Sequence, residues 1–120
     1  MKIKRFTLNG SAPKFLNEIS REVVLNYAGR HTILDAQQIR DIFVTGCKDV
    51  GTAHIVETEA EYNARSYEDS WERSSDEIII PSGEKLYVTT QWRAGKRGDN
   101  FFRFIDVVHA MGWGKIVKIV

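Results

Sequence analysis

The fold of this chain is decided by its last third, residues Glu77–Val120, which read EIIIPSGEKLYVTTQWRAGKRGDNFFRFIDVVHAMGWGKIVKIV. A β-branched run, Ile78–Ile80, stops at a tetrapeptide rich in turn-forming residues, Pro81–Glu84. Residues 86–92 then alternate with the two-residue period of a strand. Because a short loop with proline and glycine separates the two runs, the pattern predicts an antiparallel β-hairpin.

A helix and a strand are predicted after the hairpin. Asp99 is placed to be the N-cap of the helix, and Gly112 is placed to end it as a left-handed C-cap residue. Residues 116–120 form a final β-rich run. If this strand shares a sheet with the hairpin, the crossover through the helix is expected to be right-handed. The apolar face of the helix, at positions i, i+3, i+4 and i+7, is predicted to be core: Phe101, Phe104, Ile105 and Val108.

The first thirty residues predict a strand followed by a helix. Residues 2–8 alternate as in a half-buried strand. Ser11 is a suitable N-cap for a helix, Pro13 is tolerated in a first helical turn, and Gly29 supplies a stop. This helix is expected to bury one apolar face: Leu16, Ile19, Val23 and Tyr27.

The clearest helix start in the chain lies at Asp35. Gln38 follows it by three residues, which is the pattern of a capping box. This second helix is expected to stop at Gly46, and residues 51–57 are expected to form a strand. The sequence therefore predicts one α+β domain over residues 1–120, with a mainly antiparallel sheet, about three helices and a C-terminal β-hairpin–helix–strand unit.

Size and composition are those of an ordinary globular domain. The chain has 120 residues, of which 42% are hydrophobic and 28% charged, and its formal net charge is +1. A charge this small predicts no strong attraction of the whole molecule to nucleic acid or membranes. The single cysteine, Cys47, excludes an internal disulfide and fits a reducing compartment. Without a membrane-spanning run or a secretory signal, the chain is expected to be cytoplasmic and to have no membrane partner.

The segment Glu57–Glu77 differs from the rest of the chain in charge. It holds eight acidic residues and two arginines, which gives a local charge of −6. We expect it to be exposed, with its first residues continuing the preceding strand and their glutamates facing water. Its aromatic residues, Tyr62, Tyr67 and Trp71, are candidate partner-binding residues because aromatic side chains are enriched at interfaces. The alternatives are that the segment docks on the basic face of its own domain or stays mobile.

The best local signal for a ligand is a basic loop before the last helix. Free backbone N–H groups and the helix dipole favour an anion at a helix N-terminus, and glycines let the anion approach the backbone. The spacing matches neither a P-loop nor a dinucleotide-binding fingerprint. The alternative is a solvated connection in which Trp92 lies in the core. The candidate ligand-binding residues are Trp92, whose ring could stack on a base or sugar, Arg93, Lys96, Arg97 and Asn100.

The signals for catalysis are weaker. The three histidines are far apart in the sequence and show no metal-binding spacing. His31 and His54 could converge on Cys47 as a nucleophile arrangement, but a lone cysteine after a helix-stopping glycine is usually a small packing residue. Acidic residues near Lys85 suggest either a metal-dependent nuclease core or solvated hairpin ends: Asp76, Glu77 and Glu84.

The leading functional prediction is a small non-enzymatic binding module, without cofactor or metal, that presents the basic loop to an anionic ligand. The ligand is either nucleic acid or a phosphorylated small molecule. The alternative is a regulatory or inhibitory protein that acts by protein contact through the acidic aromatic segment, and a hydrolase or nuclease comes third. Phosphate contacts give binding a steep salt dependence, which separates the first two classes.

Overall fold

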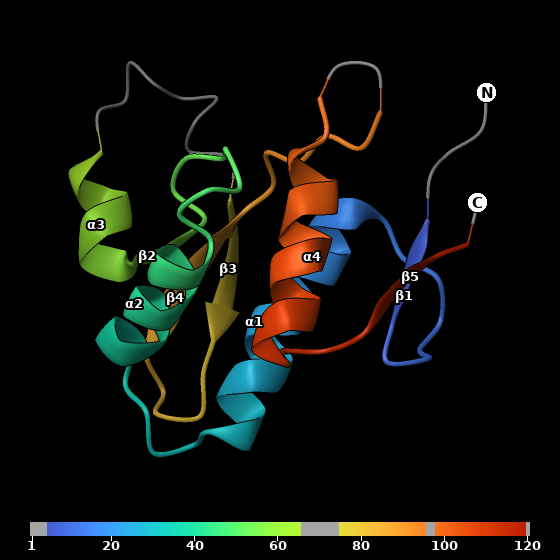
Figure 1. Ribbon diagram of the computed structural model, residues 1–120. Helices are drawn as coiled ribbons and strands as arrows, with labels where there is room; N and C mark the ends of the chain where they lie inside the picture. Colours follow the sequence, from blue (N-terminus) through green and yellow to red (C-terminus); the bar gives the residue numbers. More distant parts are fainter. Residues whose placement is uncertain (1–4, 66–74, 96–97, 120) are drawn as a thin grey trace.

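Four helices and two antiparallel sheets form the described part of the chain, residues 5–65, 75–95 and 98–119 of the computed structural model (Figure 1). The predicted α+β class with antiparallel strands is confirmed, and the short α3 is an addition to the predicted helices. None of the helices in this part of the chain is long and apolar enough to cross a membrane. In chain order the elements are β1 (Phe6–Leu8), α1 (Leu16–Arg30), α2 (Ala36–Gly46), β2 (Val56–Thr58), α3 (Glu59–Ala64), β3 (Ser75–Ile79), β4 (Lys85–Thr89), α4 (Asn100–Met111) and β5 (Ile116–Lys118).

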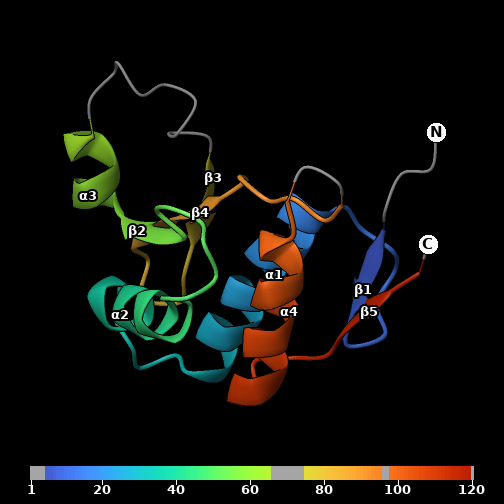
Figure 2. The same cartoon turned by 45° about the horizontal axis from the view of Figure 1, so that its top comes forward.

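The predicted hairpin is confirmed as strands β3 and β4. They pair antiparallel, with Ile78 opposite Leu86 and Ile79 opposite Lys85. Strand β2 pairs with the other side of β4, so the order of the larger sheet is β2-β4-β3. Leu86 and Val88 point to the same face of the sheet, opposite to the side chain of Tyr87 between them, and both are buried in the core cluster. Helices α1 and α2 contact this sheet and lie alongside it in Figure 2.

The other face of the larger sheet carries acidic residues, one of which is buried. Glu57 of β2 and Glu77 of β3 both lie opposite Tyr87 of β4, so the three side chains share a face. The expectation that Glu57 faces water is wrong, because the residue is only 4% exposed. Helix α3 covers this face with Tyr62, whose ring stacks on that of Tyr87.

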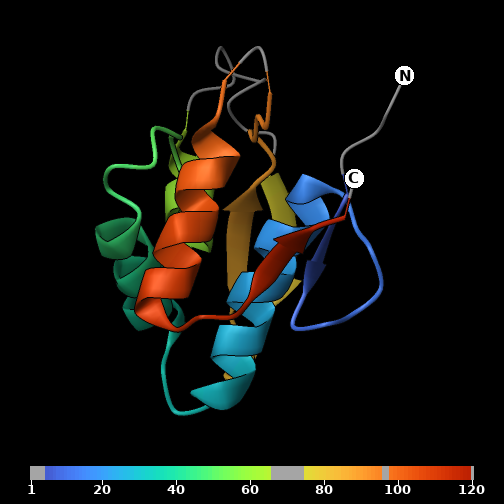
Figure 3. The same ribbon diagram turned by 45° about the vertical axis from the view of Figure 1, so that its right-hand side comes forward.

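The C-terminal strand pairs with the N-terminal strand in a second sheet. In the antiparallel β1–β5 pair, Phe6 lies opposite Lys118 and Leu8 opposite Ile116. β5 therefore does not join the hairpin sheet, and the right-handed crossover between them does not arise. Figure 3 shows the β1–β5 pair with α1 and α4. The ring of Phe6 packs edge-on against Phe101 of α4, with ring centroids 4.9 Å apart.

Helix α1 begins later and ends later than predicted. Phe6 and Lys14 exchange two backbone hydrogen bonds of 2.9 and 2.8 Å, which keeps the chain extended past Ser11 and Pro13. Ser11 is therefore not the N-cap, and its hydroxyl accepts a hydrogen bond from a backbone N–H three residues earlier (3.4 Å). Gly29 lies inside the helix and does not stop it.

The capping box at the start of α2 is confirmed. The Asp35 carboxylate accepts a hydrogen bond from the N–H of Gln38 at 2.8 Å, and Oε1 of Gln38 accepts one from the N–H of Asp35 at 2.9 Å. Glu84, in the β3–β4 turn, accepts a further hydrogen bond from the N–H of Ala36 at 3.1 Å. The hairpin turn thereby satisfies one of the N–H groups that a helix start leaves without a helical partner. Helix α2 ends at Gly46, as predicted.

The predicted strand over residues 51–57 is wrong in its first five residues. Strand β2 begins at Val56, because Gly51 and His54 have positive φ angles of 85° and 54° that a regular strand does not contain. After β2, Thr58 and Glu61 form a second capping box that starts α3. The Thr-x-x-Glu spacing is the sequence signal for this helix.

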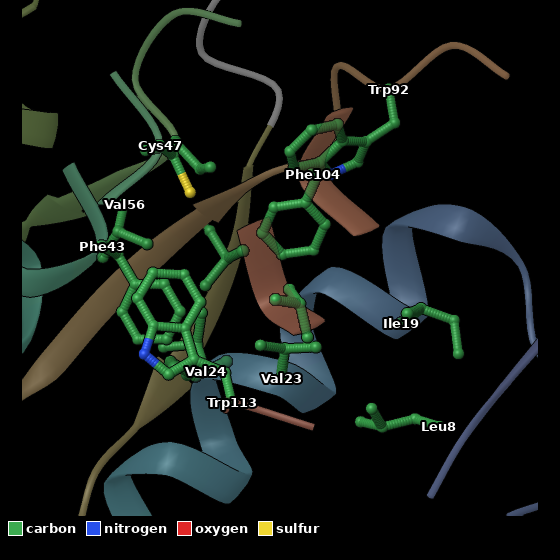
Figure 4. Packing of buried hydrophobic residues seen from close by; sticks show 14 of the residues in the cluster. Leu8, Ile19, Val23, Val24, Phe43, Cys47, Val56, Trp92, Phe104 and Trp113 are labelled. Carbon is green, nitrogen blue, oxygen red and sulfur yellow. The ribbon is translucent and has the colours of Figure 1, made fainter. Parts of the chain in front are cut away.

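Helix α4 has the predicted position and the predicted core face. Phe101, Phe104 and Val108 are buried, and Ile105 is half-buried against the same cluster. Gly112 has the left-handed conformation expected of the residue that ends the helix, with φ 71°. Figure 4 shows the cluster around Phe104, which joins side chains from both halves of the chain.

Candidate functional site

The two glycines of the basic loop lie opposite each other. Gly95 and Gly98 exchange two backbone hydrogen bonds, of 2.8 and 3.1 Å. Lys96 and Arg97, both predicted to bind ligand, fall between these glycines and lie outside the described residues. Gly98 has φ 148°, and a Cβ placed there would lie 3.1 Å from Cδ of Arg93. The aliphatic part of the Arg93 side chain therefore lies against Gly98, and the residue is exposed.

Trp92 does not offer its ring to a ligand. The residue is 7% exposed, and its ring packs against those of Phe101 and Phe104 with centroids 5.5 and 4.6 Å away. Figure 4 shows Trp92 beside Phe104 in the core cluster. The predicted stacking of Trp92 on a base or sugar is wrong, and the alternative that places it in the core holds.

The first turn of α4 already uses several of its N–H groups. Phe101 donates its N–H to the carbonyl oxygen of Arg93 (3.1 Å), while Phe102 and Arg103 donate theirs to that of Asp99 (3.0 and 3.3 Å). Asp99 is at the N-cap position, but its side chain caps no N–H and accepts a hydrogen bond from Nη1 of Arg103 at 2.6 Å. The helix N-terminus therefore offers an anion less than the sequence suggests.

Asn100 joins the basic loop to the start of α4 through two side-chain hydrogen bonds. Its Oδ1 accepts a hydrogen bond from the N–H of Arg93 at 2.7 Å, and its Nδ2 donates one to the carbonyl oxygen of Gln91 at 3.1 Å. These two bonds fix the chain on both sides of Trp92 against the start of α4. Asn100 therefore positions Arg93 as well as lining the space beside it.

A polar hollow of about 190 Å³ lies beside Arg93. It forms where the loop before β2 meets the loop before α4. Oγ1 of Thr52 donates a hydrogen bond to the carbonyl oxygen of Gln91 at 3.2 Å and so joins the two loops. We call this space the loop hollow, and its lining residues are Gly51, Thr52, Ala53, His54, Gln91, Arg93 and Asn100.

Two arginines lie at the loop hollow, one in its lining and one behind it. Arg93 and His54 line it directly. Arg103 lies behind Gly51, since its Nε donates a hydrogen bond to the carbonyl oxygen of Val50 at 2.9 Å and a Cβ placed at Gly51 would lie 3.1 Å from its Nη2. The charge of Arg103 is compensated by an aspartate. Among the described residues, no carboxylate forms a salt bridge with Arg93.

Five residues of the loop hollow were not predicted as ligand contacts: Gly51, Thr52, Ala53, His54 and Gln91. About forty residues separate the two loops in the sequence, and no local pattern marks them as neighbours. The pairing of β2 with β4 brings them together.

A second hollow, of about 300 Å³, adjoins the first. Thr52 and His54 line both spaces. The other walls of the second space come from α2, β2 and α3 and include Val44, Cys47 and Glu57. We call it the thiol hollow. It brings His54 and Cys47 to one surface, which is part of the convergence considered from the sequence.

The surroundings of Cys47 do not favour a nucleophile. The residue is buried, and burial raises the pKa of its thiol to about 12, so the thiolate is scarce at neutral pH. Figure 4 shows its sulfur directed at the buried cluster. His31 stacks on Tyr27 with ring centroids 4.3 Å apart and lines neither hollow. These observations favour the packing role of Cys47 over the catalytic one.

Two carboxylates of the thiol hollow are held by arginines. Oε1 of Glu57 lies 2.8 Å from Nη2 of Arg65, and its Oε2 lies 3.5 Å from Nδ1 of His54. Burial raises the pKa of Glu57, and the charges of Arg65 and His54 oppose the rise. Glu61 accepts two hydrogen bonds from Arg40, of 3.0 and 2.8 Å. Burial acts to raise the pKa of Glu61, but the hydrogen bonds from Arg40 and from the N-cap threonine lower it overall.

Tyr62 is the one predicted partner-binding residue that the structure describes, since Tyr67 and Trp71 lie outside the described residues. Its ring stacks on that of Tyr87, with centroids 4.0 Å apart and planes 2° from parallel. The guanidinium of Arg65 lies over the Tyr62 ring, 5.3 Å from its centroid. This end of the acidic segment therefore docks on its own domain, but on the sheet face that carries Glu57 and Glu77 and not on the basic face that was predicted as an alternative.

The carboxylates near Lys85 have partners within the fold. Asp76 pairs with Arg21 at 3.6 Å, and Glu77 accepts a hydrogen bond from the hydroxyl of Tyr87 at 3.0 Å and pairs with Lys85 at 3.5 Å. The charge of Glu77 is the main reason that the pKa of Lys85 is raised. Within the described ranges, no three His, Cys, Asp or Glu side chains are arranged to hold a metal ion. These acids therefore give the nuclease hypothesis no support.

Comparison with known proteins assigns no family. No model of a known protein family matches the chain, a search of curated proteins finds no match, and a search of solved structures finds none. The function is therefore argued from the chemistry of the loop hollow and the thiol hollow.

Proposed function

We propose that the protein is a small non-enzymatic binding module whose loop hollow receives the phosphate group of a phosphorylated small molecule. The observation that carries this proposal is the presence of Arg93 and His54 on one polar hollow. A guanidinium matches two phosphate oxygens at once, and an imidazole can add a further hydrogen-bond donor. The hydroxyl of Thr52 and the amide of Asn100 add polar groups to the same lining.

The size of the loop hollow favours one phosphate group over a whole ligand. Its volume of about 190 Å³ lies below the roughly 300–1,000 Å³ of typical small-molecule sites. Gly51 places bare backbone on the lining, so an anion can approach closely there. An ester phosphate fits this space with its organic part outside it.

The distribution of charge favours a small ligand over nucleic acid. The net charge of +1 gives the molecule little long-range attraction for a polyanion. Binding of single-stranded nucleic acid relies on a cationic groove that tracks the backbone and on exposed aromatic rings. Trp92 is not exposed, and Arg93 and His54 converge on a single hollow. Nucleic acid is therefore the competing outcome of the test.

A regulatory protein that acts through the acidic aromatic segment is the second candidate. Its anchors were expected to be Tyr62, Tyr67 and Trp71. Of these, Tyr62 is stacked on Tyr87 of its own chain, which leaves less of its ring for a partner. We therefore rank this candidate below the phosphate-binding module.

The test is a titration with inorganic phosphate, CMP and a short single-stranded RNA at low and high salt. Arg93→Glu is expected to weaken phosphate binding at least tenfold, because it replaces the donor with a repelling charge. Lys118→Glu is the matched control, since it makes the same change of charge at an exposed residue of β5. Its phosphate affinity is expected to stay within twofold of wild type, and circular dichroism checks that both variants fold.

The proposal fails if wild type binds neither phosphate nor CMP at low salt, or if Arg93→Glu binds phosphate as tightly as wild type. If RNA binds tightly with a steep salt dependence while phosphate and CMP do not bind, nucleic acid is the ligand.

A further inference from the structure

We infer that the loop hollow and the thiol hollow are two halves of one binding site, which takes a phosphate monoester with its compact organic group in the thiol hollow. The inference rests on the proposed function, because it requires the phosphate to lie beside Arg93. It goes further in assigning the class of the organic group. That group has an apolar surface and hydrogen-bond donors, as the base of a pyrimidine nucleotide does.

The two hollows are separated by Thr52 and His54, which line both of them. The loop that carries this partition is tied to its surroundings. Oγ1 of Thr52 donates a hydrogen bond to Gln91 at 3.2 Å, and Nε of Arg103 donates one to the carbonyl oxygen of Val50 at 2.9 Å. The partition is therefore held in place by the fold, and one ligand can contact it from both sides.

His54 is the residue of the partition with the most unusual backbone. Its φ of 54° lies in the left-handed region. Glycine adopts this conformation readily, and other residues, apart from asparagine, adopt it much less often. Such backbone conformations cluster at ligand sites, where the surrounding structure maintains them. Nδ1 of His54 lies 3.5 Å from Oε2 of Glu57, so a carboxylate of the thiol hollow orients a ring that also lines the loop hollow. We place His54 at the junction between the phosphate and the organic group.

The lining of the thiol hollow combines apolar, acidic and basic side chains. Val44, Ile55 and the protonated thiol of Cys47 offer apolar contact. Glu57 and Glu61 add carboxylate oxygens, Lys48 adds a cation, and the guanidinium of Arg40 is bound to Glu61. A carboxylate has about four acceptor positions. Those of Glu61 are taken by four hydrogen bonds from Arg40 and Thr58, whereas Glu57, which contacts Arg65 and His54, keeps acceptor positions for a ligand N–H group. The exocyclic amine of cytosine matches this combination.

The volumes of the two hollows are consistent with the phosphate in the loop hollow and the organic group in the thiol hollow. The volume of about 300 Å³ in the thiol hollow reaches the lower end of the roughly 300–1,000 Å³ range of small-molecule sites. The smaller loop hollow holds the phosphate. A ligand that fills both halves loses translational and rotational freedom once for two sets of contacts, so it binds more tightly than either fragment.

The experiment compares CMP with its two fragments, inorganic phosphate and cytidine, by titration calorimetry of wild type and two variants. Val44→Phe enlarges a half-buried side chain that lines the thiol hollow but not the loop hollow. Ile42→Phe is the matched control, because it enlarges a half-buried residue of the same helix that lines neither. CMP is expected to bind wild type at least tenfold more tightly than phosphate. Val44→Phe is expected to reduce CMP affinity to that of phosphate, with phosphate affinity changed less than twofold.

The outcomes distinguish failure of this inference from failure of the proposed function. If CMP binds wild type no more tightly than phosphate, while Arg93→Glu still weakens phosphate binding at least tenfold, the proposed function stands and the two-part site is wrong. If Val44→Phe and Ile42→Phe weaken CMP equally, the thiol hollow is not part of the site. If phosphate and CMP both fail to bind wild type, both proposals are wrong.

A measurement on wild type keeps the inference testable if Val44→Phe does not fold. In the NMR spectrum, CMP is expected to shift the methyl signals of Val44 and Ile55, which line the thiol hollow. Inorganic phosphate is expected to shift the amide signals of Gly51 and Arg93 and to leave those methyl signals unchanged. Methyl signals that CMP leaves unmoved overturn the two-part site.

Discussion

The carboxylate of Glu57 lies 2.8 Å from the guanidinium of Arg65, and the two side chains are only 6% and 10% exposed. Glu57 belongs to β2 and Arg65 follows α3, so this ion pair ties the short helix back to the sheet. A buried ion pair stabilises a fold only when its attraction offsets the desolvation of both charges. For Glu57, the effect of burial on the pKa is larger than the opposing effect of the Arg65 charge, because the pKa is raised overall.

Glu57→Gln is expected to change the pH dependence of stability. A raised pKa means that protonated Glu57 stabilises the fold relative to the ionised form, in full below the ordinary pKa of 4.5, and that this contribution is lost as pH rises through the folded value. Glutamine mimics the protonated form at every pH. The unfolding free energy of the variant, relative to wild type, should therefore increase as pH rises from about 4 through the raised pKa. Urea unfolding of both proteins at several pH values measures this difference in unfolding free energy. A difference that stays constant or falls as pH rises contradicts the prediction.

Phe104→Ala is expected to destabilise the protein by about 3–5 kcal/mol, because it leaves a cavity in a close-packed core. Phe104 is 1% exposed and packs against the rings of Trp92 and Phe101. The denaturant midpoint measures the effect. Phe102→Ala on the same helix is the control, since Phe102 is half-buried and should cost clearly less. Equal midpoints for the two variants would place Phe104 outside the core.

Alanine substitutions at Gly112 and Gly29 are expected to have opposite effects. A Cβ would meet nothing within 4 Å at either position, so backbone conformation alone decides the sign. Gly112 has φ 71°, and alanine there should cost about 1 kcal/mol or more. Gly29 lies inside helix α1, where alanine should stabilise by about 0.5–1 kcal/mol. Thermal unfolding of both variants measures the two effects. Changes of unfolding temperature with the same sign in both variants would refute the argument.

The thiol of Cys47 is expected to react slowly with iodoacetamide in the native protein. With a pKa raised from 9.0 to about 12, its thiolate fraction at about pH 8 is roughly a thousandfold below that of an ordinary thiol. Alkylation should accelerate by a similar factor in urea, where burial is lost. A native rate equal to the rate in urea would instead identify an activated cysteine and revive the hydrolase hypothesis.

The parts of the fold that could be predicted depend on residues close together in the sequence. The capping box of Asp35 and Gln38 spans three residues, and its side chains and backbone satisfy each other whatever the rest of the chain does. Gly112 ends α4 because a left-handed residue costs glycine nothing. The β3–β4 hairpin follows from a short turn between two β-rich runs.

The candidate site was predicted only in part, because its two loops are distant in the sequence. Arg93 and Asn100 were identified from local charge and helix-start signals. His54 and Thr52 were not, since they reach the same hollow only when β2 pairs with β4. Trp92 was misplaced because an aromatic residue beside a basic loop looks the same in sequence whether its ring faces solvent or the core.

The sequence alone therefore determined the class of fold, the limits of α2 and α4 and the presence of a basic loop around Arg93. Only the tertiary structure decided that β5 pairs with β1, that Glu57 is buried, and that His54 separates two adjoining hollows. The physical reason is the distance along the sequence over which each interaction acts. Capping and turn formation are settled by neighbours within a few residues, whereas strand partners and burial depend on which distant apolar surfaces the whole chain brings together to exclude water.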